Sequence, residues 1–140
     1  MFIKKASCLH KCEHNPQPKH SAWFNLWFLN AFVGHIGGDD FVAIISKYDY
    51  PKLCKEIIKE FDELVPEYYT EEDVERGFVE VANRRGIIEE FPIVTISIGV
   101  VEVESGKYTT PLEIGEVSAQ VKHKAKEIQG STYVINRRKF

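Results

Sequence analysis

The sequence predicts a domain of the α/β or α+β class, in which helices pack on a β-sheet. Three observations predict this class. Residues 51–65 and 110–128 carry apolar side chains at helical spacing, residues 93–103 alternate as in a strand, and a glycine-rich turn at 37–40 separates two short apolar runs. The 140 residues match the size of one domain, which is enough for a single hydrophobic core.

The composition is that of an ordinary globular protein, with 44% hydrophobic and 28% charged residues and a formal net charge of −3. This charge excludes a generally basic nucleic-acid binder, which holds phosphates with Lys and Arg.

Three cysteines are too few for a disulfide scaffold and suit a reducing compartment. The most apolar stretch, residues 22–36, is shorter than the roughly 20 residues of a membrane helix. We therefore expect no membrane partner and a cytoplasmic location.

Residues 1–31 differ in character from the rest of the chain. The first 21 residues hold ligand types that tetrahedral zinc prefers, but at a spacing that matches no common zinc finger (Cys8, His10, Cys12, His14 and His20). We expect a mobile, metal-free tail there, with a zinc site as the alternative. The aromatic-rich residues 22–32 follow. We expect them to be buried against the sheet, with a partner-binding or membrane-surface patch as the alternative.

The first regular elements are a hairpin and a helix. Residues 31–36 and 41–45 predict two strands, because the turn between them supplies glycines and aspartates that tight turns favour. Residues 51–65 predict the clearest helix, since their apolar residues share one face (Cys54, Ile57, Ile58, Phe61, Leu64 and Val65). Pro51 suits the first turn of this helix, and Cys54 belongs to its buried face.

The middle of the chain predicts a second hairpin and a long strand. Residues 68–76 are acidic and irregular, and residues 78–82 and 87–91 flank a turn. In the strand at 93–103, bulky residues alternate with small ones, so one face is apolar and the other allows a helix or a ligand to approach closely.

The last elements are a helix and a strand. Thr110, Pro111 and Glu113 form a capping box with proline at the first helical position, and the helix extends to about residue 128. The lysines near its end suit the helix dipole (Lys122, Lys124 and Lys126). Residues 132–135 predict a final strand.

Three motifs occur in the order found in the GGDEF domain family, the diguanylate cyclases. His35-Ile36-Gly37-Gly38-Asp39-Asp40-Phe41 resembles the family signature. Residues 94–100 look like the later core strand V-T-x-S-x-G, and Ala125-Lys126 before Gly130 resembles the A-K-x-x-G of the last helix. The resemblance covers about residues 32–138, which divides the chain into an atypical segment, 1–31, and a GGDEF-like domain, 32–140. It implies a nucleotidyl-cyclase-like, ferredoxin-like mixed sheet that is incomplete at the N-terminal side.

The resemblance also implies roles for single residues. Active members join two GTP molecules into cyclic diguanylate with Mg²⁺, between two facing domains. Asp39 would be a metal ligand and Asp40 would assist catalysis. Gly37 and Gly38 would let the backbone approach the nucleotide, and Lys126 would contact phosphate. These residue types suit the chemistry, because Mg²⁺ prefers carboxylate oxygens and phosphoryl transfer depends on charge neutralisation and positioning.

Several positions depart from the family pattern. No segment before the turn matches the family's second metal-binding aspartate or its guanine-reading residues. His35 replaces the usual arginine and Asp40 the usual glutamate, while Ala119 and His123 replace an aspartate and a tyrosine of the last helix. We therefore expect a degenerate GGDEF-type domain of bacterial signalling that is regulatory or nucleotide-sensing and has no cyclase activity. It would use Mg²⁺ if it retains nucleotide binding.

Two other functions stay open, an active diguanylate cyclase and a structural interaction domain without nucleotide binding. A homodimer is compatible with each of the three. In the family fold the first strand is central to the sheet, and its loss would leave open strand edges and exposed apolar surface. We expect residues 22–32 to fill that place. A truncated or frame-shifted gene is another explanation for the abrupt start of the resemblance near Phe32.

Overall fold

The computed structural model describes residues 2–5, 31–46 and 49–136, the first of these ranges as backbone. It contains both helices and strands, and the predicted mixed class of helices and sheet is confirmed. The elements are β1 (Phe2–Lys5), β2 (Phe32–Gly37), β3 (Asp40–Ile44), α2 (Tyr50–Leu64), the 3-10 turn η1 (Val65–Tyr68), α3 (Glu71–Arg76), β4 (Phe78–Ala82), β5 (Ile88–Pro92), β6 (Ile96–Val100), α4 (Pro111–Lys126) and β7 (Thr132–Ile135).

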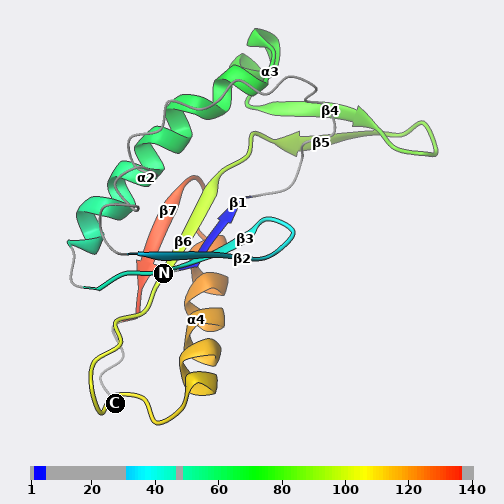
Figure 1. Ribbon diagram of the computed structural model, residues 1–140. Coiled ribbons are helices and arrows are strands. Elements are labelled where there is room, and N and C mark those ends of the chain that lie inside the picture. Colours follow the sequence, from blue (N-terminus) through cyan, green and yellow to red (C-terminus); the bar gives the residue numbers. More distant parts are fainter. Residues whose placement is uncertain (1, 6–30, 47–48, 137–140) are drawn as a thin grey trace.

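The central sheet has the strand order β2-β3-β1-β6-β7 (Figure 1). Strand β1 pairs antiparallel with β3 on one side and with β6 on the other, while β6 and β7 are parallel. The β2–β3 hairpin therefore forms one side of the sheet, and its turn carries the glycine-aspartate motif. The predicted hairpin at residues 31–45 is confirmed.

The central place in the sheet is held by Phe2–Lys5, which corrects two expectations from the sequence. Residues 2–5 are a paired strand rather than part of a tail. The central place that was expected for residues 22–32 is held by β1, and Phe32 begins β2 at the side of the sheet. The remaining expectations for residues 6–30, including the zinc ligands and the aromatic stretch, lie outside the described residues.

Helices α2 and α4 cover opposite faces of the sheet. Ile96, Ile98 and Val100 of β6 are buried in one cluster with Leu53 and Cys54 of α2. The residues between them in β6 point the other way, and there the sheet meets α4. Burial raises the pKa of the Cys54 thiol to about 11, as expected of a core side chain.

Gly99 in β6 lets α4 lie close against the sheet. A Cβ at this position would lie 3.1 Å from the backbone nitrogen of Lys122 and 3.3 Å from its Cα. Ser97, two residues earlier, donates from its hydroxyl to the carbonyl of Ala125 at 3.5 Å. The small face predicted for this strand is thus used by a helix, and α4 is held at a fixed height above β6.

Both predicted long helices are confirmed, and each has a side chain that caps its N-terminus. The Asp49 side chain accepts from the backbone N–H of Lys52, and the Thr110 hydroxyl accepts from that of Glu113 at 3.3 Å. Glu113 reaches back to the backbone N–H of Thr109 at 2.8 Å rather than to Thr110, which lowers the pKa of its carboxyl. The α4 capping box is therefore closed one residue earlier than its usual form.

The middle of the chain differs from expectation at two places. Residues 71–76, predicted to be irregular, form the short helix α3, because Thr70 caps it and Gly77 ends it in the left-handed conformation. The strand expected at 93–103 is regular over Ile96–Val100 only. Before it, the N–H of Ile93 donates to the carbonyl of Gly77 and the N–H of Val94 donates to the hydroxyl of Tyr69, so neither takes part in the sheet. The predicted β4–β5 hairpin is confirmed.

Candidate functional site

The glycine-aspartate turn connects β2 to β3 and is closed by a histidine. Gly38 has φ of 58°, which favours glycine, and the strand register shifts between His35 and Gly37. His35 Nε2 lies 2.9 Å from the carbonyl oxygen of Gly38, and because a carbonyl only accepts, Nε2 carries the proton. The His35 ring also contacts Phe41, with ring centres 4.8 Å apart. His35 thus holds the turn in shape.

Asp40 is tied to the helix across the sheet face. Its Oδ2 accepts from Lys122 Nζ at 2.8 Å, and both side chains are about three-quarters buried, with relative exposures of 26% and 24%. Asp39 Oδ2 and Asp40 Oδ1 are shielded from solvent. Of the two acids, Asp40 is therefore neutralised within the chain by a lysine that reaches it from α4.

The strand register places the turn and the end of α4 at the same level of the sheet. Asp40 is paired with Lys4 of β1, and Lys4 is paired with Ser97 of β6. Because Ser97 bonds to Ala125 of α4, the neighbouring Lys126 lies at the level of this row. Lys126 is exposed and one helical turn beyond Lys122. The structure thus brings Asp40 and Lys122 into contact and sets Lys126 at the same end of the sheet.

At Asp40 the turn departs from the magnesium site that the resemblance implies. Mg²⁺ binds through carboxylates together with phosphates and water. Here Oδ2 of Asp40 is engaged by Lys122, and the residue paired with Asp40 in β1 is Lys4 rather than an acid. Within residues 31–46 and 49–136, no three His, Cys, Asp or Glu side chains gather as a possible metal site. The metal-ligand role of Asp39 stays a prediction.

Lys122 is the site residue that sequence reasoning missed. Its position near the end of a helix predicts only an interaction with the helix dipole, as for Lys124 and Lys126. Its carboxylate partner lies 82 positions earlier, so no local spacing links the two. The small side of β6 was the available signal, because Gly99 and Ser97 predict that a helix backbone comes near this face.

Comparisons with models of protein families, with curated proteins and with solved structures found no significant match for this chain. No helix among the described residues is both long and apolar enough to cross a membrane.

Proposed function

We propose that this chain is a degenerate GGDEF-type signalling domain that senses a nucleotide and makes no cyclic diguanylate. The ion pair between Asp40 and Lys122 carries the proposal, since Asp40 stands at the position to which the resemblance assigns catalysis. A carboxylate held by an internal lysine is not presented to a metal ion or to a substrate hydroxyl. The domain would keep the turn that approaches a nucleotide and lack the charge arrangement for transfer.

The strand order supports a nucleotidyl-cyclase-like fold. The family's first strand is central to its sheet, and β1 here lies between β3 and β6. The signature turn then follows β2 at the side of the sheet, at the level of the last turn of α4. This arrangement brings together the motifs on which the resemblance rests.

The nucleotide-binding part of the proposal rests on the turn and on Lys126. A Cβ on Gly37 or Gly38 would meet no atom within 4 Å, so a ligand can reach this backbone. Lys126 supplies a cation at the same end of the sheet, and a lysine is a common phosphate partner. We propose a phosphate-bearing nucleotide as the ligand, and GTP is the one that the resemblance favours.

Incubation with GTP and Mg²⁺ is expected to yield no cyclic diguanylate. Phosphoryl transfer depends on positioned charges, and the described acids at the turn include one that is already paired with Lys122. Chromatography of the nucleotide products, beside an active diguanylate cyclase as positive control, measures this. Product that disappears in the Asp39→Ala variant would overturn the proposal and favour an active cyclase.

A structural interaction domain is the second candidate. It is favoured by the exposed apolar side chains on the β4–β5 hairpin. This candidate predicts that GTP does not bind at all, whereas the sensor predicts binding without turnover.

A further inference from the structure

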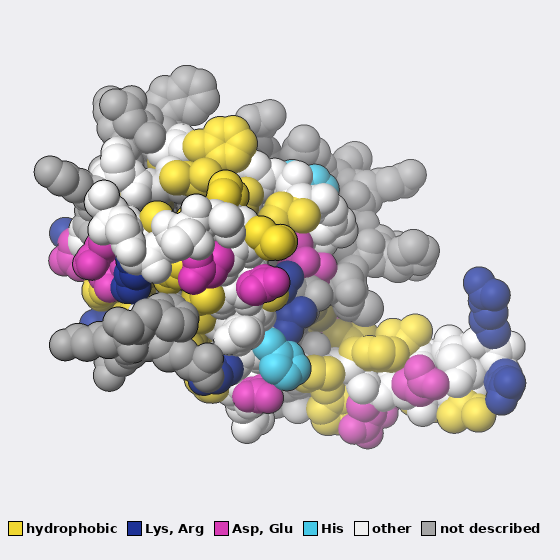
Figure 2. Space-filling view, turned by 90° about the horizontal axis from the view of Figure 1, so that it is seen from below, with side chains coloured by type: hydrophobic (Ala, Val, Ile, Leu, Met, Phe, Trp, Pro, Cys, Tyr) yellow, Lys and Arg dark blue, Asp and Glu magenta, His cyan; other side chains and the backbone are white. Residues whose placement is uncertain are grey.

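The β4–β5 hairpin, residues 78–92, stands out from the body of the protein as an arm (Figure 2). Its two strands pair with each other, and neither pairs with another strand of the described residues. Five residues of strand give it a length of about 17 Å. Large apolar side chains are exposed on it (Val81, Ile87, Ile88 and Phe91). A two-stranded hairpin has little stability of its own, so this exposure indicates a contact surface.

One face of the arm is mainly apolar. Residues directly opposite each other in an antiparallel pair point to the same face. Val79 is paired with Phe91, and Val81 with Glu89, so the two valines and the phenylalanine share a face. Glu89 on this face accepts from Asn83 Nδ2 at 2.7 Å, which satisfies its carboxylate within the arm.

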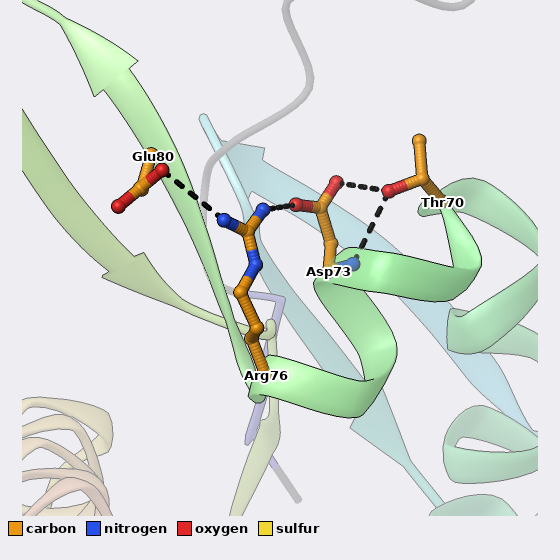
Figure 3. A network of polar contacts seen from close by, with 4 residues as sticks. All are labelled: Thr70, Asp73, Arg76 and Glu80. Carbon is orange, nitrogen blue, oxygen red and sulfur yellow. Dashed lines mark hydrogen bonds and ion pairs between the residues drawn. The ribbon is translucent and has the colours of Figure 1, made fainter.

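The arm is anchored to α3 by a polar network (Figure 3). Arg76 donates to Asp73 Oδ1 at 2.6 Å and to Glu80 Oε2 at 3.1 Å, and its guanidinium lies 5.5 Å from the ring centre of Phe78. The Thr70 hydroxyl donates to Asp73 at 2.7 Å, and together with Arg76 it holds the pKa of the Asp73 carboxyl below its usual value. Because Arg76 bridges helix and strand, the arm has a defined direction at its base.

The tip of the arm is basic, and helix α3 beside its base is rich in acidic residues. Arg84 and Arg85 are exposed at its tip, where Figure 2 shows Lys or Arg side chains at the end of the projection. The base lies against α3, at the end of a strongly acidic stretch: residues 56–75 hold nine Asp or Glu and one Lys. Glu71 and Glu75 of α3 are exposed and one helical turn apart, so they share a face.

We propose that the arm is a dimerisation element and that its partner is a second copy of this chain. In a two-fold dimer whose arms lie side by side and antiparallel, each tip reaches the base of the other arm. Arg84 and Arg85 then face the partner's Glu71 and the partner's Glu75, and the apolar faces of the two arms pack on each other. The surface is self-complementary in charge and in apolar area, as a two-fold interface requires.

Packing of the arms through their faces is favoured over pairing through their edges. A two-fold edge pairing that uses the full strand would set Glu80 opposite the partner's Glu80, or Glu90 opposite the partner's Glu90. Like charges directly opposite each other in a sheet are destabilising. On the face with Val79, Val81 and Phe91, the carboxylate of Glu89 already accepts a hydrogen bond from Asn83 within the arm.

Sedimentation of the full chain over a range of concentrations tests the proposal. The wild type is expected to form dimers that dissociate on dilution. Reversal of the tip charges, Arg84→Glu with Arg85→Glu, should weaken dimerisation at least about tenfold, because like charges then meet at both contacts. The control Lys52→Glu with Lys55→Glu makes the same change in net charge at the start of α2 and should leave the dimer intact.

A mixing experiment makes the test specific to these contacts. A variant with Glu71→Lys and Glu75→Lys should also dimerise poorly, yet it should form mixed dimers with the tip variant, since each tip then faces an opposite charge. Circular dichroism establishes that each variant is folded. The proposal is wrong if the wild type stays monomeric at every concentration, if tip reversal has no effect, or if the two variants do not associate.

Discussion

The Ile3→Pro variant is expected to be strongly destabilised. Strand β1 is paired along both edges, so the N–H of Ile3 points at either β3 or β6. Proline removes that donor and does not fit a central strand. We expect a loss of more than about 3 kcal/mol, a large part of the ~5–15 kcal/mol by which domains are stable. Urea unfolding followed by circular dichroism measures it.

The matched control is Ile3→Val, which keeps the N–H group and a β-branched side chain and should unfold close to the wild type. If Ile3→Pro unfolds at the same urea concentration as the wild type, then β1 does not hold the central place. The two sides of the sheet would then have to be joined in another way.

The Gly99→Val variant is expected to lose about 3 kcal/mol of its free energy of unfolding. The added side chain would meet the nitrogen and Cα of Lys122, which are helix backbone and cannot turn aside. Helix α4 must then move off β6, and the ion pair of Lys122 with Asp40 moves with it. Chemical denaturation measures the loss of stability. The near-UV circular dichroism of the packed aromatic residues is expected to change as well.

Gly115→Ala provides the control on the same helix. A Cβ at Gly115 meets no atom within 4 Å, and alanine is the better helix former by up to about 1 kcal/mol. This variant should be more stable than the wild type. Equal stability of Gly99→Val and the wild type would show that α4 does not lie close over β6.

Elements with strong local signals were predictable from the sequence. Helix α4 has its capping threonine and a periodic apolar stripe, and the β2–β3 turn has its two glycines. Strand β1 was missed because four residues carry too little alternation, and distant pairing with β3 and β6 decides its place. Helix α3 was missed although Thr70 and Asp73 form its cap, because Val74 is the one apolar residue among its six and no apolar stripe forms.

The site residues in the turn could be predicted from the sequence, but the contact that crosses the sheet face to α4 could not. Asp39 and Asp40 follow the glycines directly, so adjacency in sequence reveals them. The ion pair from Asp40 to Lys122 depends on the height of α4 above β6, which Gly99 sets. That height follows from the packing of a strand against a helix, and no single segment of the sequence encodes it.

A calorimetric titration with GTP, once with Mg²⁺ and once with a chelator, measures whether the chain binds the nucleotide and whether binding needs the metal. We expect GTP to bind in both conditions with similar affinity, because Lys122 and not a metal neutralises Asp40. Lys126→Ala should weaken binding about tenfold, since a charged phosphate contact is lost. Absence of binding in both conditions would contradict the nucleotide sensor, and binding that requires Mg²⁺ and is lost in Asp39→Asn would instead identify an intact metal site.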